Sequence, residues 1–233
     1  MATLTSLLLF THVVAGIITL IAGPIAIFAN RKYTKLHKIA GKTFFFAMLT
    51  ICFSSIIGYF RHEGVVFYEF LLGIAILVLA GVLRGIRALK IMKGGAVIPF
   101  DWAYTILLAI NCLYMLSYGF KLYMQGAEIV FPILFGVFGF GCLSDTITNI
   151  KMFSKPFEYE KVLWLKLHVQ TMIGCFIAST TAFTVNTAQY LPWYIQWFGP
   201  TMLLLPLQIY WGRKLSGVKK NENVQVFNSK QVV

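Results

Sequence analysis

The sequence predicts an all-α integral membrane protein: a bundle of seven transmembrane helices with the N-terminus outside and the C-terminus in the cytoplasm. Three observations lead to this expectation. Of the 233 residues, 58% are hydrophobic and only 12% are charged, and the mean hydropathy is +0.76. Long apolar runs divide the chain, and basic residues alternate between the connections that separate them. A water-soluble core has no room for that much apolar surface.

Seven apolar runs are each long enough to cross a bilayer as a helix, which takes about 20 residues at about 1.5 Å per residue. They cover residues 4–29, 43–60, 65–83, 102–123, 129–150, 167–187 and 191–211. The first run has no basic segment before it and is too long for a signal-peptide core, so we expect it to remain as a helix. We therefore expect one transmembrane domain, 1–215, followed by a polar, loosely ordered cytoplasmic tail, 216–233.

Basic residues decide the orientation, because cytoplasmic connections retain Lys and Arg. The first, third and fifth connections and the tail hold Arg31, Lys32, Lys35, Lys38, Lys42, Arg84, Arg87, Lys90, Lys93, Lys151, Lys155, Lys161, Lys166, Arg213, Lys214, Lys219, Lys220 and Lys230. Only Arg61 and Lys121 remain for the other side. This alternation explains the net charge of +12 without a nucleic-acid partner. Membrane lipids, with anionic headgroups at the cytoplasmic face, are the expected partners.

Signature motifs of soluble enzymes are missing from the sequence, which has no GxSxG, no P-loop and no GxGxxG. Its cysteines, Cys52, Cys112, Cys142 and Cys175, lie inside apolar runs without CxxC spacing. We expect them to be buried thiols rather than a disulfide or zinc framework. Whether the protein is an enzyme, and whether it binds a metal, stays open at this point.

Four short motifs are similar to those of a known group of proteins. They are His12-x3-Gly16 with Gly23-Pro24, Leu36-His37-Lys38-x2-Gly41-Lys42, Trp164-x3-His168-x3-Met172, and the ending Trp197-x2-Pro200 with Pro206 and Trp211. Together they resemble bacterial seven-helix predicted membrane proteins of unknown function, as found in Bacteroidetes-like sequences. The resemblance covers most of the chain. It implies the seven-helix fold and a bacterial inner-membrane location, and it implies no reaction.

Ionisable residues at membrane depth are the candidate functional residues, since each costs roughly 2.5 kcal/mol or more to insert. They fall into two levels. The outer tier is His12, Glu69 and His62, and the inner tier is Asp145, His168 and His37, with Asn149 on the helix face of Asp145. We expect Asp145 and His168 to approach each other, directly or through one water molecule, and to face the bundle rather than lipid. His168, Thr171, Cys175, Ser179 and Asn186 also share one polar stripe, which either lines a path or hydrogen-bonds neighbouring helices.

Three classes of function fit these residues. In the first, which we favour, the protein handles protons or a small solute through an inner cavity lined by Asp145 and His168. In the second, it is a transmembrane electron carrier in which His12 with His62, and His37 with His168, each hold a b-type haem, as in the general plan of cytochrome b561-type carriers. In the third, it is a structural or accessory protein. A zinc site of His37, His168 and Asp145 lacks the closely spaced histidine pair typical of zinc hydrolases.

Overall fold

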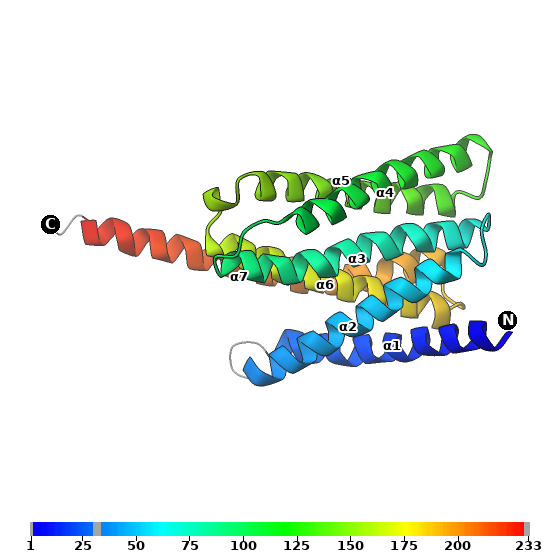
Figure 1. Ribbon diagram of the computed structural model, residues 1–233, viewed down its shortest axis with the longest axis horizontal. Helices are drawn as coiled ribbons and strands as arrows, with labels where there is room; N and C mark the ends of the chain where they lie inside the picture. Colours follow the sequence, from blue (N-terminus) through cyan, green and yellow to red (C-terminus); the bar gives the residue numbers. More distant parts are fainter. Residues whose placement is uncertain (1, 30–33, 231–233) are drawn as a thin grey trace.

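The computed structural model describes residues 2–29 and 34–230, and the side chains within 6–29 and 34–216. The described residues are all-helical, without strands, as expected. In chain order the helices are α1 (Ala2–Phe28), α2 (Thr34–Tyr59), α3 (Val66–Met92), α4 (Pro99–Met124), α5 (Val130–Ser154), α6 (Lys161–Thr187) and α7 (Trp193–Lys230), with a short 3-10 helix, η2 (Pro156–Glu158), before α6 (Figure 1). Among the described residues, α1 to α6 are long and apolar enough to cross a membrane.

The bundle has two cores that share α3. In Figure 1, α4 and α5 lie on one side of α3, and α1 and α2 lie on the other. Phe44, Val82 and Phe176 belong to the first core, which α1, α2, α3 and α6 enclose. Phe70 and Phe135 belong to the second, which is formed mainly by α3, α4 and α5. Helix α7 packs along α6.

Glycines bring the helices close together at two levels of the bundle. A Cβ on Gly23 of α1 would lie 2.5 Å from the Phe176 ring of α6, and one on Gly73 of α3 would lie 2.8 Å from Met115 of α4. Within lipid, where no hydrophobic effect drives helix association, such close approach supplies van der Waals contact.

The helices extend beyond several of the apolar runs, and this corrects the expected connections. Helix α2 begins at Thr34 rather than at residue 43, α3 continues to Met92 rather than ending at 83, and α6 begins at Lys161 rather than at 167. Arg84 and Arg87, expected in a loop, therefore lie within α3. Helix α7 likewise continues to Lys230, through the segment expected as a loosely ordered tail. A helix keeps its backbone hydrogen bonds across such polar ends, which an apolar window does not detect.

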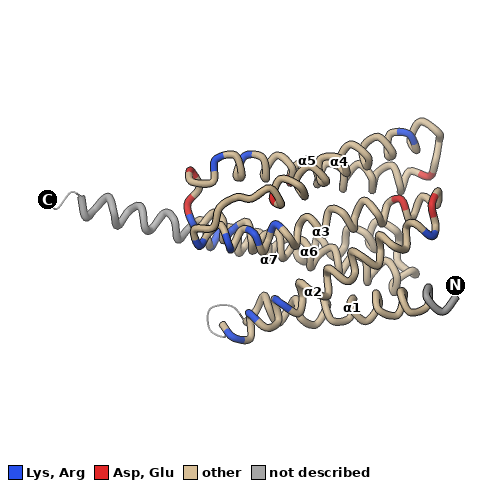
Figure 2. Tube along the Cα trace, in the orientation of Figure 1, with Lys and Arg blue, Asp and Glu red and all other residues tan. Residues whose placement is uncertain are grey.

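Most Lys and Arg positions lie at one end of the bundle (Figure 2). We call it the basic end; it holds the end of α1, the start of α2, and the α3–α4 and α5–α6 connections. Arg61, just after α2, and Lys121, in the last turn of α4, belong to the opposite end. The two ends of the bundle therefore differ in their content of Lys and Arg, as the sequence predicts.

Candidate functional site

Arg84 and Asp145 form an ion pair between α3 and α5. Nη2 of Arg84 donates to Oδ2 of Asp145 at 2.7 Å, and Nη1 donates to Oδ1 of Asn149 at 3.4 Å. The side chain of Arg84 is 6% exposed and that of Asp145 is 31% exposed. Because a guanidinium stays protonated in proteins, it supplies the carboxylate with a permanent counter-charge.

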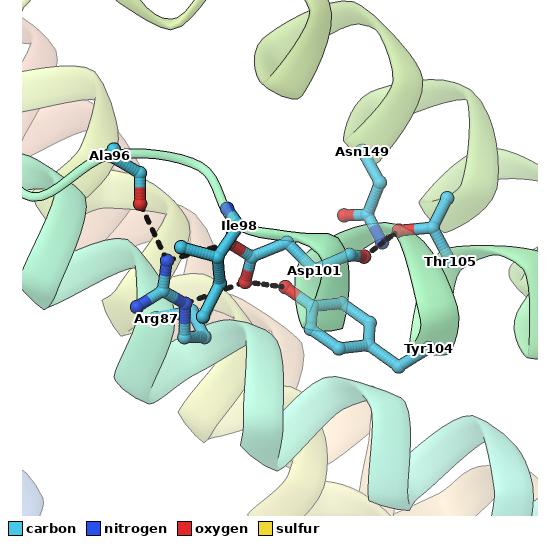
Figure 3. A network of polar contacts seen from close by, with 7 residues as sticks. All are labelled: Arg87, Ala96, Ile98, Asp101, Tyr104, Thr105 and Asn149. Atoms are coloured by element: carbon cyan, nitrogen blue, oxygen red, sulfur yellow. Dashed lines mark hydrogen bonds and ion pairs between the residues drawn. The ribbon is translucent and has the colours of Figure 1, made fainter.

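A second ion pair lies between α3 and α4, closer to the basic end. Nε and Nη2 of Arg87 donate to the two carboxylate oxygens of Asp101, each at 2.6 Å. Asp101 is fully buried, and it also accepts hydrogen bonds from the backbone N–H of Ile98 at 2.9 Å and from the hydroxyl of Tyr104 at 3.3 Å. Figure 3 shows these groups converging on the carboxylate. Its charge is thus fully compensated by a bidentate, hydrogen-bonded partner.

Asn149 and Thr105 connect the two ion pairs. Nδ2 of Asn149 donates to the hydroxyl of Thr105 at 3.1 Å, and that hydroxyl donates to the backbone carbonyl of Asp101 at 2.7 Å (Figure 3). We call the whole set the polar network; it consists of Arg84, Arg87, Asp101, Tyr104, Thr105, Asp145 and Asn149. It carries two positive and two negative charges and joins α3, α4 and α5.

Three buried polar atoms, one of them in the polar network, have no hydrogen-bond partner among the described residues. They are Nε of Arg84, Oγ1 of Thr146 and Oδ1 of Asn111. Asn111 itself donates to the backbone carbonyl of Gly73 at 2.9 Å and contacts Sγ of Cys142 at 3.3 Å. On α5, Thr146 lies one turn from Cys142, which contacts Asn111, and one turn from Asn149, which contacts Arg84. Its depth in the bundle is therefore between those of Asn111 and Arg84. The three atoms mark a polar stretch that continues from the polar network towards the opposite end.

The outer-tier residues do not form one site. Glu69 is buried on α3, accepts a hydrogen bond from the hydroxyl of Tyr114 on α4, and accepts another from the backbone N–H of Gly64. His12 on α1 instead bonds the hydroxyl of Ser54 on α2, with 2.7 Å between Nδ1 and Oγ. His62 donates to the backbone carbonyl of Gly58 at 3.0 Å and stacks on Tyr68. Glu69 therefore faces α4, whereas His12 faces α2.

Asp145 and His168 each have another partner in the structure, so no direct hydrogen bond joins them. Asp145 pairs with Arg84, and Nδ1 of His168 donates to the backbone carbonyl of Gly85 at 2.8 Å. Two hollows open on the described surface, one between α4 and α5 around Gly136 and one on α7 around Pro206, and neither is lined by Asp145 or His168. Asp145, which was expected to pair with His168 of α6, is instead paired with Arg84 of α3.

The polar stripe of α6 is satisfied by packing. Thr171 and Cys175 are buried against the small surface of Gly81 on α3, and Ser179 exchanges a hydrogen bond of 2.8 Å with Thr19 of α1. Asn186 is exposed and donates to the backbone carbonyl of Ala182 in its own helix. The stripe therefore holds α6 against α1 and α3.

No group of three or more His, Cys, Asp or Glu side chains able to hold a metal ion occurs among the described residues. The trio of His37, His168 and Asp145 considered for zinc accordingly does not assemble. His37 instead bonds the backbone carbonyl of Ala26 at 2.7 Å.

Searches against protein-family models, curated proteins and solved structures found no match for this chain.

Several residues of the polar network were not expected from the sequence. Arg84 and Arg87 fell just after an apolar run and were assigned to a connection, and Asp101, just before the next run, was not considered. The signal that could have identified Arg84 is charge balance, because a carboxylate at membrane depth such as Asp145 requires a cationic partner. Asn111, near the middle of a span, was not among the residues expected from the sequence, because no charged residue lies within two turns on its own helix face to draw attention to it.

Replacing Asp101 with Ala should lower the free energy of unfolding by about 3–5 kcal/mol, because Arg87 would keep a buried charge without its partner. The matched control is Glu158→Ala, which breaks the Lys155–Glu158 pair, whose side chains are 66% and 63% exposed. An exposed pair contributes less than about 1 kcal/mol. Unfolding in mixed micelles, followed by circular dichroism, measures both variants. Equal effects of the two substitutions would contradict a buried ion pair at Asp101.

Proposed function

We propose that this protein handles protons, or a small polar solute, through the polar network and the polar stretch that continues it. The observation that carries the proposal is a connected set of charged and amide side chains buried within apolar helices, followed by three unpartnered polar atoms. Holding helices together does not require buried charges, since well-packed apolar residues of similar volume do this as well or better. Buried ionisable groups in membrane helices typically mark paths for ions or protons.

The unpartnered atoms indicate where water enters the path. A buried polar atom without a hydrogen bond costs about 1–3 kcal/mol, and internal water molecules commonly satisfy such groups when two to four polar partners are available. Nε of Arg84, Oγ1 of Thr146 and Oδ1 of Asn111 belong to α3, α5 and α4, and on α5 Thr146 lies between Asn149, which contacts Arg84, and Cys142, which contacts Asn111. Water held between them would connect Asp145 with the centre of the bundle.

Met115 and Phe70 separate this stretch from the outer carboxylate. Both are fully buried, and Met115 packs on Gly73, one turn of α3 away from Glu69. The Met115 side chain is flexible and unbranched, so a rotamer change there is the smallest movement that extends the path to Glu69 and Tyr114.

In this proposal Asp145 remains the central ionisable group of the path, as the sequence suggested, and its partner is Arg84 rather than His168. A structural or accessory function would need only the packing contacts, and it leaves the three unpartnered atoms without a purpose.

Proton flux into proteoliposomes tests the proposal. Vesicles carrying an internal pH dye are given a potassium gradient with valinomycin, and the full-length protein should acidify or alkalinise them faster than protein-free vesicles. Thr146→Val should slow the flux about tenfold, because losing a hydrogen bond that contributes about 1.4 kcal/mol in the rate-limiting state changes a rate by that factor. Asp145→Asn should abolish it.

The matched control is Thr148→Val, on the same helix. The hydroxyl of Thr148 donates to the backbone carbonyl of Ser144 in its own helix and lies outside the polar stretch. This variant should conduct like the unmodified protein. Wild-type flux equal to that of empty vesicles, or equal slowing by Thr146→Val and Thr148→Val, would contradict the proposal.

We further propose that all seven helices span a bacterial inner membrane, with the basic end in the cytoplasm. Helix α7 contains Gln208, whose amide donates to the backbone carbonyl of Gln170 on α6 at 3.0 Å, so this polar side chain is satisfied within the bundle. Retained Lys and Arg mark cytoplasmic connections, and these residues gather at the basic end (Figure 2). The family resemblance supports the same location.

Reporter fusions test this orientation. Green fluorescent protein fused after residue 233 should fluoresce, and alkaline phosphatase fused there should be inactive, because the first folds in the cytoplasm and the second only outside. The control is fusion after Ala188, at the end of α6, which should reverse both readings. An active phosphatase at residue 233 would contradict the proposed orientation.

A further inference from the structure

His37 and His168 share one arrangement that neither the polar network nor the packing of the bundle uses. Nδ1 of His37 lies 2.7 Å from the carbonyl oxygen of Ala26, and Nδ1 of His168 lies 2.8 Å from that of Gly85. A carbonyl oxygen only accepts, so Nδ1 of each ring carries the proton. In the neutral ring, Nε2 is then a bare lone pair, which is the form that binds a metal. No hydrogen bond to either Nε2 is formed within the described residues.

The two histidines belong to the same end of the same four-helix core. His37 lies near the start of α2 and bonds α1, while His168 lies near the start of α6 and bonds α3. Both rings are half-buried, and each lies within the first eight residues of its helix, so both belong to the basic end. All four helices of the core that contains Phe44 and Phe176 therefore contribute to this arrangement.

Space and charge beside His37 also suit a large anionic cofactor. Gly41 lies one turn further along α2, and a Cβ built on it would meet nothing within 4 Å. Lys38 and Lys42 flank it at the basic end, where Lys and Arg gather (Figure 2). Carboxylate groups on a bound cofactor would be attracted to this end.

We propose that His37 and His168 are the two axial ligands of one b-type haem at the basic end. Haem iron needs only two axial ligands from the protein, whereas zinc commonly takes three or four, and no third donor joins this pair among the described side chains. The backbone carbonyls of Ala26 and Gly85 fix the orientation of each ligating ring, as outer-shell acceptors do in metal sites. The site is independent of the proposed proton path.

The outer histidines do not form a second site of this kind. His12 faces Ser54, and the ring of His62 is stacked on Tyr68 with 4.2 Å between ring centroids. One haem is therefore expected, rather than the two that the histidine tiers of the sequence suggested.

Absorption spectroscopy of the full-length protein, purified from haem-supplemented cells and titrated with haemin, tests the site. We expect a Soret band and, after reduction, the sharp α-band of six-coordinate low-spin haem. His37→Ala and His168→Ala should each convert the bound haem to a high-spin form, and added imidazole should restore the low-spin spectrum. His12→Ala and His62→Ala, the matched controls, should keep the spectrum of the unmodified protein.

Other outcomes would overturn the haem site. They are a protein that stays colourless after titration, equal spectral changes in all four histidine variants, or bound copper without a Soret band. Size-exclusion elution as a single peak identifies variants that are folded, and His168→Met, which retains a ligand, should remain six-coordinate with a shifted spectrum if His168→Ala does not fold. Asp145→Asn should leave the haem spectrum unchanged, so failure of the proton path and failure of this site are distinguishable.

Discussion

A bilayer offers no water to a buried charge, and this constraint governs the arrangement of α3, α4 and α5. Arg84 and Arg87 lie one turn apart on α3 and pair with Asp145 of α5 and Asp101 of α4. Each carboxylate thereby gains a partner that cannot lose its charge. The same contacts set the register between α3 and the α4–α5 hairpin, because a shift of one residue would leave a buried charge unpaired.

Much of the fold could be predicted from the sequence, because helix length and apolar composition in a membrane protein follow from the thickness of the bilayer. The residues at which the helices begin and end could not be predicted in this way. Lys161 and Arg87 lie on helices that extend beyond the apolar runs, because a helix hydrogen-bonds internally whether or not its surface is apolar. A hydropathy window reports which residues prefer lipid, and it does not report where the backbone stops being helical.

The candidate site was only partly predictable. Asp145 stood out because an isolated carboxylate is costly in lipid, but its partner depended on which helices are neighbours, and the chain order does not fix this. Helix α3 directs Arg84 towards α5 and the carbonyl of Gly85 towards α6. Asp145 and His168 therefore bind consecutive residues on different faces of α3 rather than each other. The contact between His168 and Gly85 involves a backbone atom, which leaves no trace in a pattern of side chains.

A double-mutant cycle between Arg84 and Asp145 tests the central claim most directly, with unfolding and proton flux measured on the same variants. Asp145→Leu should lower the free energy of unfolding by about 3 kcal/mol or more, since it leaves the buried Arg84 without its partner. Arg84→Met should lower it by less, since the Asp145 side chain is 31% exposed. The double variant should be more stable than either single variant and should still fail to conduct protons. Additive losses of stability, or a double variant that conducts like the unmodified protein, would contradict the account.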